Sequence, residues 1–299
     1  MHYNSKLLLF GEYLIINSGR ALAIPFKQYG GQWDYDPEQL GLQQDLSGLL
    51  AHLVDLQERK ELLAELDLDK FYKDLDRGIF FDSNIPVGYG LGSSGALCGA
   101  LYDRYATGGK ITKNSVGDFP HLKNVLSQME SYFHGSSSGI DPLISYINQG
   151  IVINETGGVD ILKTNTKPHE HKFFILDTNI PRSTAPLVKL FLEKCKDSSY
   201  KNKIDQALRL ASNAAIDNYI DNNWVGLEGD VSQISTLQYQ LFQEMIPEAF
   251  RCIWREGLET TSFSLKLCGA GGGGFILGYT SDLQQCQKAL KGFNWQVIK

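Results

Sequence analysis

The chain has 299 residues, of which 42% are hydrophobic and 21% are charged, values typical of a globular protein with a large core. Its net charge is −6 and its lysines and arginines are scattered, which argues against a broad nucleic-acid-binding face. No apolar run is long enough to span a bilayer, and Leu7–Phe10 is too short for a signal peptide. The five cysteines are widely spaced, which disfavours a disulfide framework or a thiolate zinc site. We therefore expect a cytoplasmic protein that binds neither nucleic acid nor membrane.

The first half of the chain is predicted to mix strands and helices. Short apolar runs around a turn at 17–19 predict a β-meander, with strands at 6–10, 13–16 and 21–24. Apolar residues recur every three or four positions from 40 to 76, which predicts amphipathic helices. A strand at 79–81 then leads into a glycine-rich turn. Further helices are expected at 95–105, 121–134 and 140–147, followed by a strand that begins at 152.

The second half continues this irregular alternation. A strand is predicted at 173–176, after a polar stretch at 163–171 near which we place a domain boundary. Helices are expected at 184–194, 203–219, 230–256 and 282–291, and strands at 263–267 and 275–279. Because strands and helices intermix without a regular strand–helix–strand repeat, we predict an α+β fold with domains at 1–165 and 166–299.

The most informative segment is the glycine- and serine-rich stretch from Pro86 to Ala96, which precedes a predicted helix. Glycines let backbone N–H groups converge on an anion, and the N-terminus of the next helix adds partial positive charge. Ser93 or Ser94 is also suited to capping that helix or to ligating Mg²⁺. The segment therefore predicts a phosphate loop, with contacts from Gly88, Gly90, Leu91, Gly92, Ser93, Ser94 and Gly95.

Two well-known nucleotide-binding motifs fit this loop less well. A Walker A loop requires Gly-Lys-Ser/Thr, and the segment has no lysine. The pattern G-x-G-x-x-G occurs at 90–95 and again at 269–274, and no acid follows at the distance that a dinucleotide fold requires. A turn without a ligand, and a simple hairpin at 269–274, stay open as alternatives for each loop taken alone.

Three segments in this order resemble the motifs of the GHMP kinases, a superfamily of small-molecule kinases. They are Lys6–Glu12 with its continuation to Pro25, Pro86–Ala96 and Lys266–Gly274. Within the superfamily, two further segments are similar to the mevalonate kinases: Glu130–Asp141, with His-Gly between the two acids, and Asp177–Thr184.

The resemblance implies a fold, two cofactors and an acceptor. The fold would have an N-terminal ribosomal-protein-S5-like α+β domain and a C-terminal ferredoxin-like α+β domain. The cofactors would be ATP and Mg²⁺, and the acceptor a small-molecule alcohol, with mevalonate the first candidate. A monomer or a homodimer is expected.

The sequence also departs from the mevalonate kinase pattern. Tyr13 stands where those kinases commonly have His, Ser137 stands where they commonly have Pro, and Gly95 replaces a usual alanine. The chain is also short for that family. The departure at Tyr13 touches the substrate side, so the identity of the alcohol stays open.

The resemblance also implies roles for individual residues. Asp141 would accept the proton of the substrate hydroxyl, and Lys6 would keep that carboxylate ionised. Ser94 and Glu130 would hold Mg²⁺, with Ser93 as the second candidate hydroxyl. The expected substrate-binding residues are Glu12, His134, Thr184, Gly271 and Gly272.

Each assignment has an alternative. Asp141 is also placed to cap a helix, Glu130 would suit a surface position on a polar helix, and His134 would complement a helix dipole. The alternative functions are another GHMP kinase (phosphomevalonate kinase, sugar kinase or homoserine kinase), diphosphomevalonate decarboxylase, a non-catalytic GHMP-fold binding protein and a nicotinamide oxidoreductase. A binding protein that had lost catalysis would be expected to lack Lys6 or Asp141, and both are present.

Overall fold

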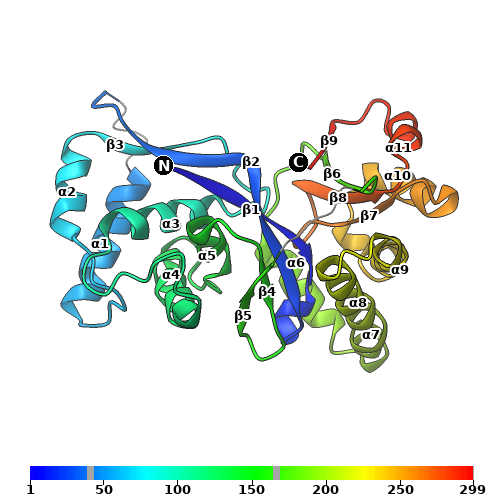
Figure 1. The fold of residues 1–299 in the computed structure, drawn as a ribbon, viewed down its shortest axis with the longest axis horizontal. Coiled ribbons are helices and arrows are strands. Elements are labelled where there is room, and N and C mark those ends of the chain that lie inside the picture. The colour runs from blue at the N-terminus through cyan, green and yellow to red at the C-terminus, as the bar shows by residue number, and fades with distance from the viewer. Residues whose placement is uncertain (39–43, 164–168, 299) are drawn as a thin grey trace.

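The computed structural model describes residues 1–38, 44–163 and 169–298, and the side chains of 44 and 45 are not described. It contains two antiparallel sheets with helices packed around them (Figure 1). The predicted α+β class is therefore confirmed. No helix within these ranges is both long and apolar enough to cross a membrane.

The first sheet is built on the long strand β2, which pairs with three others. Its order is β1-β2-β4-β5, with β3 also paired to β2. In the β1–β2 pair Lys6 lies opposite Pro25. The strands are β1 (His2–Phe10), β2 (Ala21–Tyr35), β3 (Ile79–Ser83), β4 (Ile151–Ile153) and β5 (Val159–Ile161).

Five helices accompany this sheet, and α3 and α5 pack directly on β1 and β2. They are α1 (Gln44–Glu58), α2 (Leu68–Asp76), α3 (Ser93–Tyr105), α4 (Phe119–His134) and α5 (Ile140–Ile147). Glycines bring α3 close to α5, because a Cβ at Gly95 would lie 2.8 Å from the backbone of Asp141 and one at Gly99 would lie 3.0 Å from the Pro142 carbonyl. This close packing sets the start of α5 beside the start of α3.

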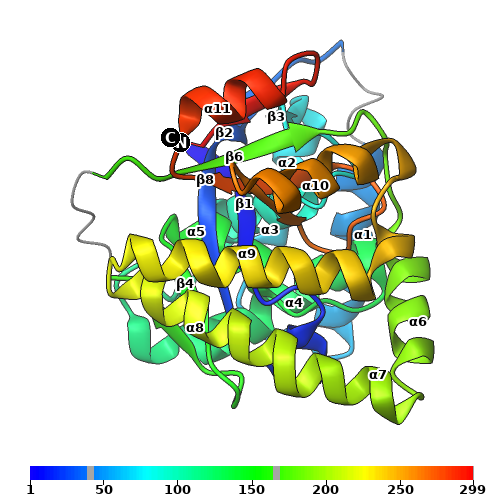
Figure 2. The ribbon, with the colours of Figure 1, turned by 90° about the vertical axis from the view of Figure 1, so that its right-hand side faces the viewer.

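The second sheet has the order β7-β8-β6-β9, and all its pairs are antiparallel. Its strands are β6 (Lys172–Asp177), β7 (Ser264–Leu267), β8 (Phe275–Thr280) and β9 (Trp295–Val297). Helix α9 packs on β7 and β8 and runs beside α8, as Figure 2 shows. The helices of this half are α6 (Thr184–Lys194), α7 (Ser198–Lys203), α8 (Arg209–Ile220), α9 (Trp224–Leu241), α10 (Glu248–Thr260) and α11 (Leu283–Ala289).

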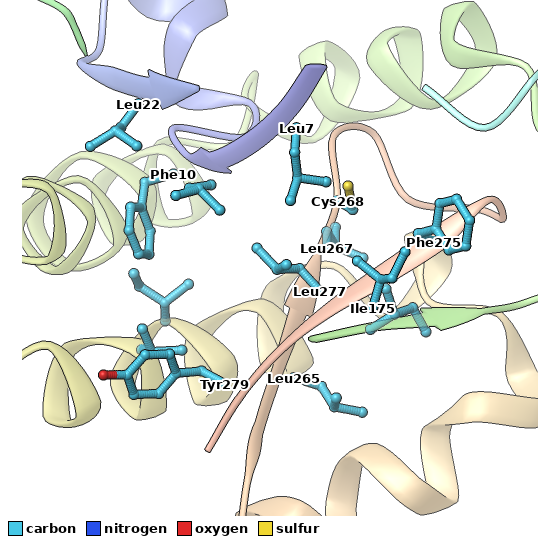
Figure 3. Packing of buried hydrophobic residues seen from close by; sticks show 14 of the residues in the cluster. Leu7, Phe10, Leu22, Ile175, Leu265, Leu267, Cys268, Phe275, Leu277 and Tyr279 are labelled. Carbon is cyan, nitrogen blue, oxygen red and sulfur yellow. The ribbon is translucent and has the colours of Figure 1, made fainter. Parts of the chain in front are cut away.

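The two sheets share one apolar core. Leu7 and Phe10 of β1 belong to the same buried cluster as Leu267, Leu277 and Tyr279 of the second sheet (Figure 3). Burial of this shared surface stabilises the contact between the two halves of the chain. The predicted boundary between 165 and 166 lies in the segment 164–168, outside the described residues, and it stays a prediction.

Two predicted elements are wrong. Residues 13–16 do not form a strand, because Tyr13 has a φ of 63° and Leu14–Asn17 is a 3₁₀ helix. The turn is tight, since a Cβ at Gly19 would lie 2.7 Å from the Leu14 carbonyl. The single helix predicted at 230–256 is divided between α9 and α10, and Pro247, which cannot donate a backbone hydrogen bond, precedes α10.

The other predicted helices and strands are present with shifted ends. The expected helix at 203–219 is longer, because α7 and α8 are joined through a π-helical turn at Ile204–Leu208. Strands β5 and β9, each of three residues, were not predicted, because three residues are too few to show an alternating pattern.

Candidate active site

The predicted phosphate loop is a tight turn that leads directly into α3. Gly88, Gly90 and Gly92 have φ angles of 79°, 72° and 74°, a region that side chains other than glycine rarely adopt. Gly92 precedes the helix, and no side chain among the described residues caps its first turn, so the alternative role of Ser93 or Ser94 as a cap is wrong. The first-turn N–H groups of α3 are therefore suited to an anionic ligand.

The predicted catalytic pair lies against this loop. Nζ of Lys6 is 3.2 Å from Oδ1 of Asp141, and the backbone N–H of Lys6 donates to the Leu91 carbonyl at 3.0 Å. A Cβ at Gly92 would lie 3.1 Å from Oδ2 of Asp141. Gly139, not Asp141, is the cap residue of α5, so the capping alternative is wrong and the carboxylate is free to face the loop.

Glu130 is a buried acid beside the same loop. Its carboxylate accepts hydrogen bonds from the hydroxyls of Ser94 (2.9 Å) and Ser137. Burial, and then the nearby charge of Asp141, raise the pKa of Glu130 to about 7, although both serines and Lys6 oppose the shift. The alternative that Glu130 is a surface residue is wrong, because it is only 5% exposed. Ser137, one of the departures from the mevalonate kinase pattern, thus supplies a donor that proline lacks.

The structure brings His134 to the metal side of the predicted site. Nε2 of His134 lies 2.9 Å from the hydroxyl of Ser94, and the imidazole stands at the exposed C-terminal end of α4. Ser94 is therefore the hydroxyl that meets both Glu130 and His134. Its neighbour Ser93 makes no side-chain hydrogen bond within the described residues, which favours Ser94 as the ligand.

Arg182 is not among the predicted site residues, and the structure places it between the two glycine loops. Its Nη1 donates to the carbonyls of Cys268 (2.9 Å) and Gly271 (3.2 Å), and its backbone N–H donates to Gly88. A Cβ at Gly90 would lie 1.6 Å from its Nη2, so the guanidinium covers the phosphate loop.

The guanidinium of Arg182 has no carboxylate partner within the described residues, and its buried Nε has no hydrogen-bond acceptor there. Burial lowers its pKa from the ordinary arginine value. A half-buried cation without a counter-ion is suited to an anionic ligand. The only sequence signal was its place in Asp177–Thr184, which does not distinguish it from a surface arginine.

The second glycine loop packs against the phosphate loop. A Cβ at Gly274 would lie 2.8 Å from the Tyr89 carbonyl, and one at Gly271 would lie 2.5 Å from the Met245 carbonyl. The N–H of Gly272 donates to Met245 at 2.6 Å. That N–H is thus already bonded, and a substrate contact at Gly272 would use other atoms.

The two remaining predicted substrate residues lie in different environments. Glu12 is buried and forms an ion pair with Lys266, and burial raises the pKa of Glu12 against the opposing effect of Lys266. Thr184 is exposed at the first position of α6. Beside Glu12, the phenol of Tyr13 donates to the Ala270 carbonyl at 2.7 Å and its ring packs on Phe191. A groove of about 630 Å³ between α1 and α2 contains none of the predicted site residues.

Comparison with known proteins identifies relatives by sequence and by fold. Residues 60–149 match the family model of the GHMP kinases N terminal domain. The fold matches L. major mevalonate kinase in complex with R-mevalonate (TM-score 0.61, 16% identity, 100% of this chain and 95% of that chain). It also matches phosphomevalonate kinase from Streptococcus pneumoniae (TM-score 0.64, 14% identity, 100% and 99%). The predicted resemblance to the GHMP kinases is confirmed by the family model and by these solved structures.

Two curated proteins that are similar in sequence to this chain are mevalonate kinases. The mevalonate kinase of Dictyostelium discoideum is 24% identical over 223 residues, which cover 65% of this chain and 55% of the relative. The mevalonate kinase of Archaeoglobus fulgidus is 29% identical over 206 residues, which cover 67% and 64%. The chain thus matches between about half and two thirds of the length of these relatives.

Proposed function

We propose that the protein is an ATP- and Mg²⁺-dependent kinase that phosphorylates the hydroxyl group of a small alcohol, with mevalonate as the first candidate. The observation that carries this proposal is the position of the Lys6–Asp141 pair, 3.2 Å apart and directly against Gly92 of the phosphate loop. These residues are far apart in the sequence, and a structural role alone does not require them to meet at a loop suited to phosphate.

The residues present fit both cofactors. Left-handed glycines and an uncapped helix N-terminus suit the phosphates of ATP. The donor set of Ser94 and Glu130, a hydroxyl and a carboxylate, suits a hard cation such as Mg²⁺. Within the described residues no group of three or more His, Cys, Asp or Glu side chains is placed to hold a metal, so nucleotide phosphates would supply further ligands. Bound Mg²⁺ would neutralise phosphate charge.

Asp141 is the group that would take the proton. As the oxygen of the alcohol forms its bond to the γ-phosphorus, the O–H bond breaks, the proton passes to the Asp141 carboxylate, and ADP leaves. The ammonium group of Lys6, 3.2 Å from the Asp141 carboxylate, stabilises the negative charge of the developing alkoxide. The partial positive charge at the start of α5 acts in the same direction, because Asp141 lies in its first turn.

Arg182 supports an acceptor that carries a carboxylate. Its guanidinium lies over Gly90 without a carboxylate partner in the described chain, and a planar fork of N–H donors matches a carboxylate. Mevalonate has such a group, whereas a neutral sugar does not. A phosphorylated acceptor, as in phosphomevalonate kinase, would call for additional cations around Arg182.

A coupled assay of ADP release tests the proposal directly. We expect turnover with mevalonate that is lost without Mg²⁺, and little turnover with phosphomevalonate, homoserine or galactose. In the variant Arg182→Gln the KM for mevalonate should rise by about tenfold or more while the KM for ATP changes little. Turnover of a neutral sugar, with no effect of Arg182→Gln, would refute mevalonate as the acceptor, and absence of ATP turnover with every alcohol would refute the kinase.

A further inference from the structure

Three side chains with metal-binding atoms meet at the first turn of α3. The hydroxyl of Ser94 lies 2.9 Å from Oε1 of Glu130 and 2.9 Å from Nε2 of His134. Glu130 and His134 are four residues apart on α4, so they project from the same face of that helix. One carboxylate oxygen, one hydroxyl oxygen and one imidazole nitrogen are thereby gathered at one place.

The two distances from the Ser94 hydroxyl match those between neighbouring ligands of a single metal ion. In an octahedral site with bonds of about 2.1 Å, neighbouring ligands lie about 3.0 Å apart, which is the bond length times √2. Bonds from imidazole nitrogen to a divalent transition ion have nearly the same length, about 2.0–2.1 Å. The i, i+4 spacing on a helix is also one by which two ligands reach one metal.

The negative charge of Glu130 also favours a cation at this place. The Glu130 carboxylate is nearly buried, and no lysine or arginine of the described chain lies within salt-bridge distance of it. A buried carboxylate without a counter-ion is unfavourable, and the hydroxyls of Ser94 and Ser137 compensate for only part of the lost hydration. The exposed imidazole of His134 leaves the place open to an ion from solvent.

We propose that His134 joins Ser94 and Glu130 as a protein ligand of the metal, and that this site selects transition ions such as Co²⁺ and Zn²⁺ over Mg²⁺. Mg²⁺ prefers oxygen ligands and retains its water, whereas an imidazole nitrogen favours the later first-row ions. The inference rests on the proposed function only in that metal and nucleotide would share this site. Binding of metal by the protein alone requires no kinase reaction.

Calorimetric titration of the full chain without nucleotide, with Co²⁺ and separately with Mg²⁺, tests the inference at about pH 8, where metal ligands are deprotonated. Co²⁺ should bind at least about tenfold more tightly than Mg²⁺. The variant His134→Gln should weaken Co²⁺ by about tenfold or more and Mg²⁺ by less than about twofold. The visible spectrum of bound Co²⁺, which responds to a nitrogen ligand, should change in the same variant.

Two further variants serve as controls. His121→Gln changes another exposed histidine of α4 and should leave both affinities unchanged. Glu130→Gln removes the charged ligand and should weaken both ions. Circular dichroism of each variant checks that it is folded.

Equal affinities of wild type and His134→Gln for Co²⁺ would overturn the inference. Ser94, Glu130 and His134 would then be a hydrogen-bonded group in which His134 is not a metal ligand. Equal weakening of Co²⁺ and Mg²⁺ by His134→Gln would overturn it as well, because the imidazole would then confer no selectivity. The assay of ADP release separates the two proposals. If Co²⁺ selectivity depends on His134 while no alcohol is phosphorylated, the metal site stands and the proposed kinase function fails.

Discussion

The buried ion pair between Glu12 and Lys266 can be tested without knowledge of the substrate. The side chains of Glu12 and Lys266 are 2% and 1% exposed. The ammonium group of Lys266 also donates to the Leu267 carbonyl at 2.9 Å and lies 5.6 Å from the centre of the Phe10 ring. Three partners thus hold one ammonium group in the core that joins the two sheets.

The variant Lys266→Met keeps much of the side-chain volume but leaves the Glu12 carboxylate buried without its cation. Loss of one partner of a buried ion pair costs about 3–5 kcal/mol of unfolding free energy. The double variant Glu12→Gln with Lys266→Met leaves no buried charge, and we expect it to lose less than about 2 kcal/mol. The deficit of Lys266→Met should shrink as the pH falls, because protonation neutralises Glu12, whose pKa burial already raises.

Urea denaturation followed by circular dichroism gives the free energies of unfolding, with the slope as a check on two-state behaviour. Lys196→Met is the matched control. Its pair with Glu193 is exposed on the surface, so the expected change is within about 0.5 kcal/mol. The losses of unfolding free energy in Glu12→Gln and in Lys266→Met could simply add in the double variant, or Lys266→Met could be as stable as wild type. Either result would refute a stabilising interaction between Glu12 and Lys266.

Four further predictions concern the proposed kinase site. Asp141→Asn should lower kcat by about 10²-fold or more with nearly unchanged ATP binding, as measured by steady-state kinetics and calorimetry; full activity would remove Asp141 from the mechanism. Glu130→Gln should raise the Mg²⁺ requirement. In the wild type Mg²⁺ affinity should increase as the pH rises through about 7, where Glu130 loses its proton, and a flat profile would contradict its role as a ligand. Gly92→Ala should lower the free energy of unfolding by about 1–2 kcal/mol, because alanine is strained at a φ of 74°. It should also weaken ATP binding, because the new methyl group would approach Asp141. The control Gly109→Ala, with a φ of 67° and open space around it, should lower stability by a similar amount and leave ATP binding unchanged.

Patterns that are local in the sequence were sufficient to predict most helices and the tight glycine turn before α3. The recurrence of apolar residues every three or four positions marks α4, which buries Leu122, Val125 and Met129 in the structure. The glycines at 88, 90 and 92 mark a turn with left-handed backbone angles, because few other residues adopt them. The helical repeat of apolar residues and the run of glycines each reflect the backbone conformation of a few adjacent residues, so they can be read from a short stretch of sequence.

Other features have no local signal. Residues 13–16 are as apolar as a strand, but contacts with Phe191, Phe242 and the second glycine loop hold Tyr13 in a left-handed turn. Nothing around Arg182 in the sequence shows that its guanidinium covers the phosphate loop. In both cases the partners come from segments far along the chain.

The residues of the proposed site could be selected from the sequence with the help of the resemblance to the GHMP kinases. Which of them lie close together depends on tertiary packing. Asp141 reaches Lys6 because α3 and α5 approach closely at Gly95 and because the Lys6 N–H bonds to Leu91. Distances between segments that are more than a hundred residues apart depend on how whole helices and sheets pack, and no short stretch of sequence contains that information.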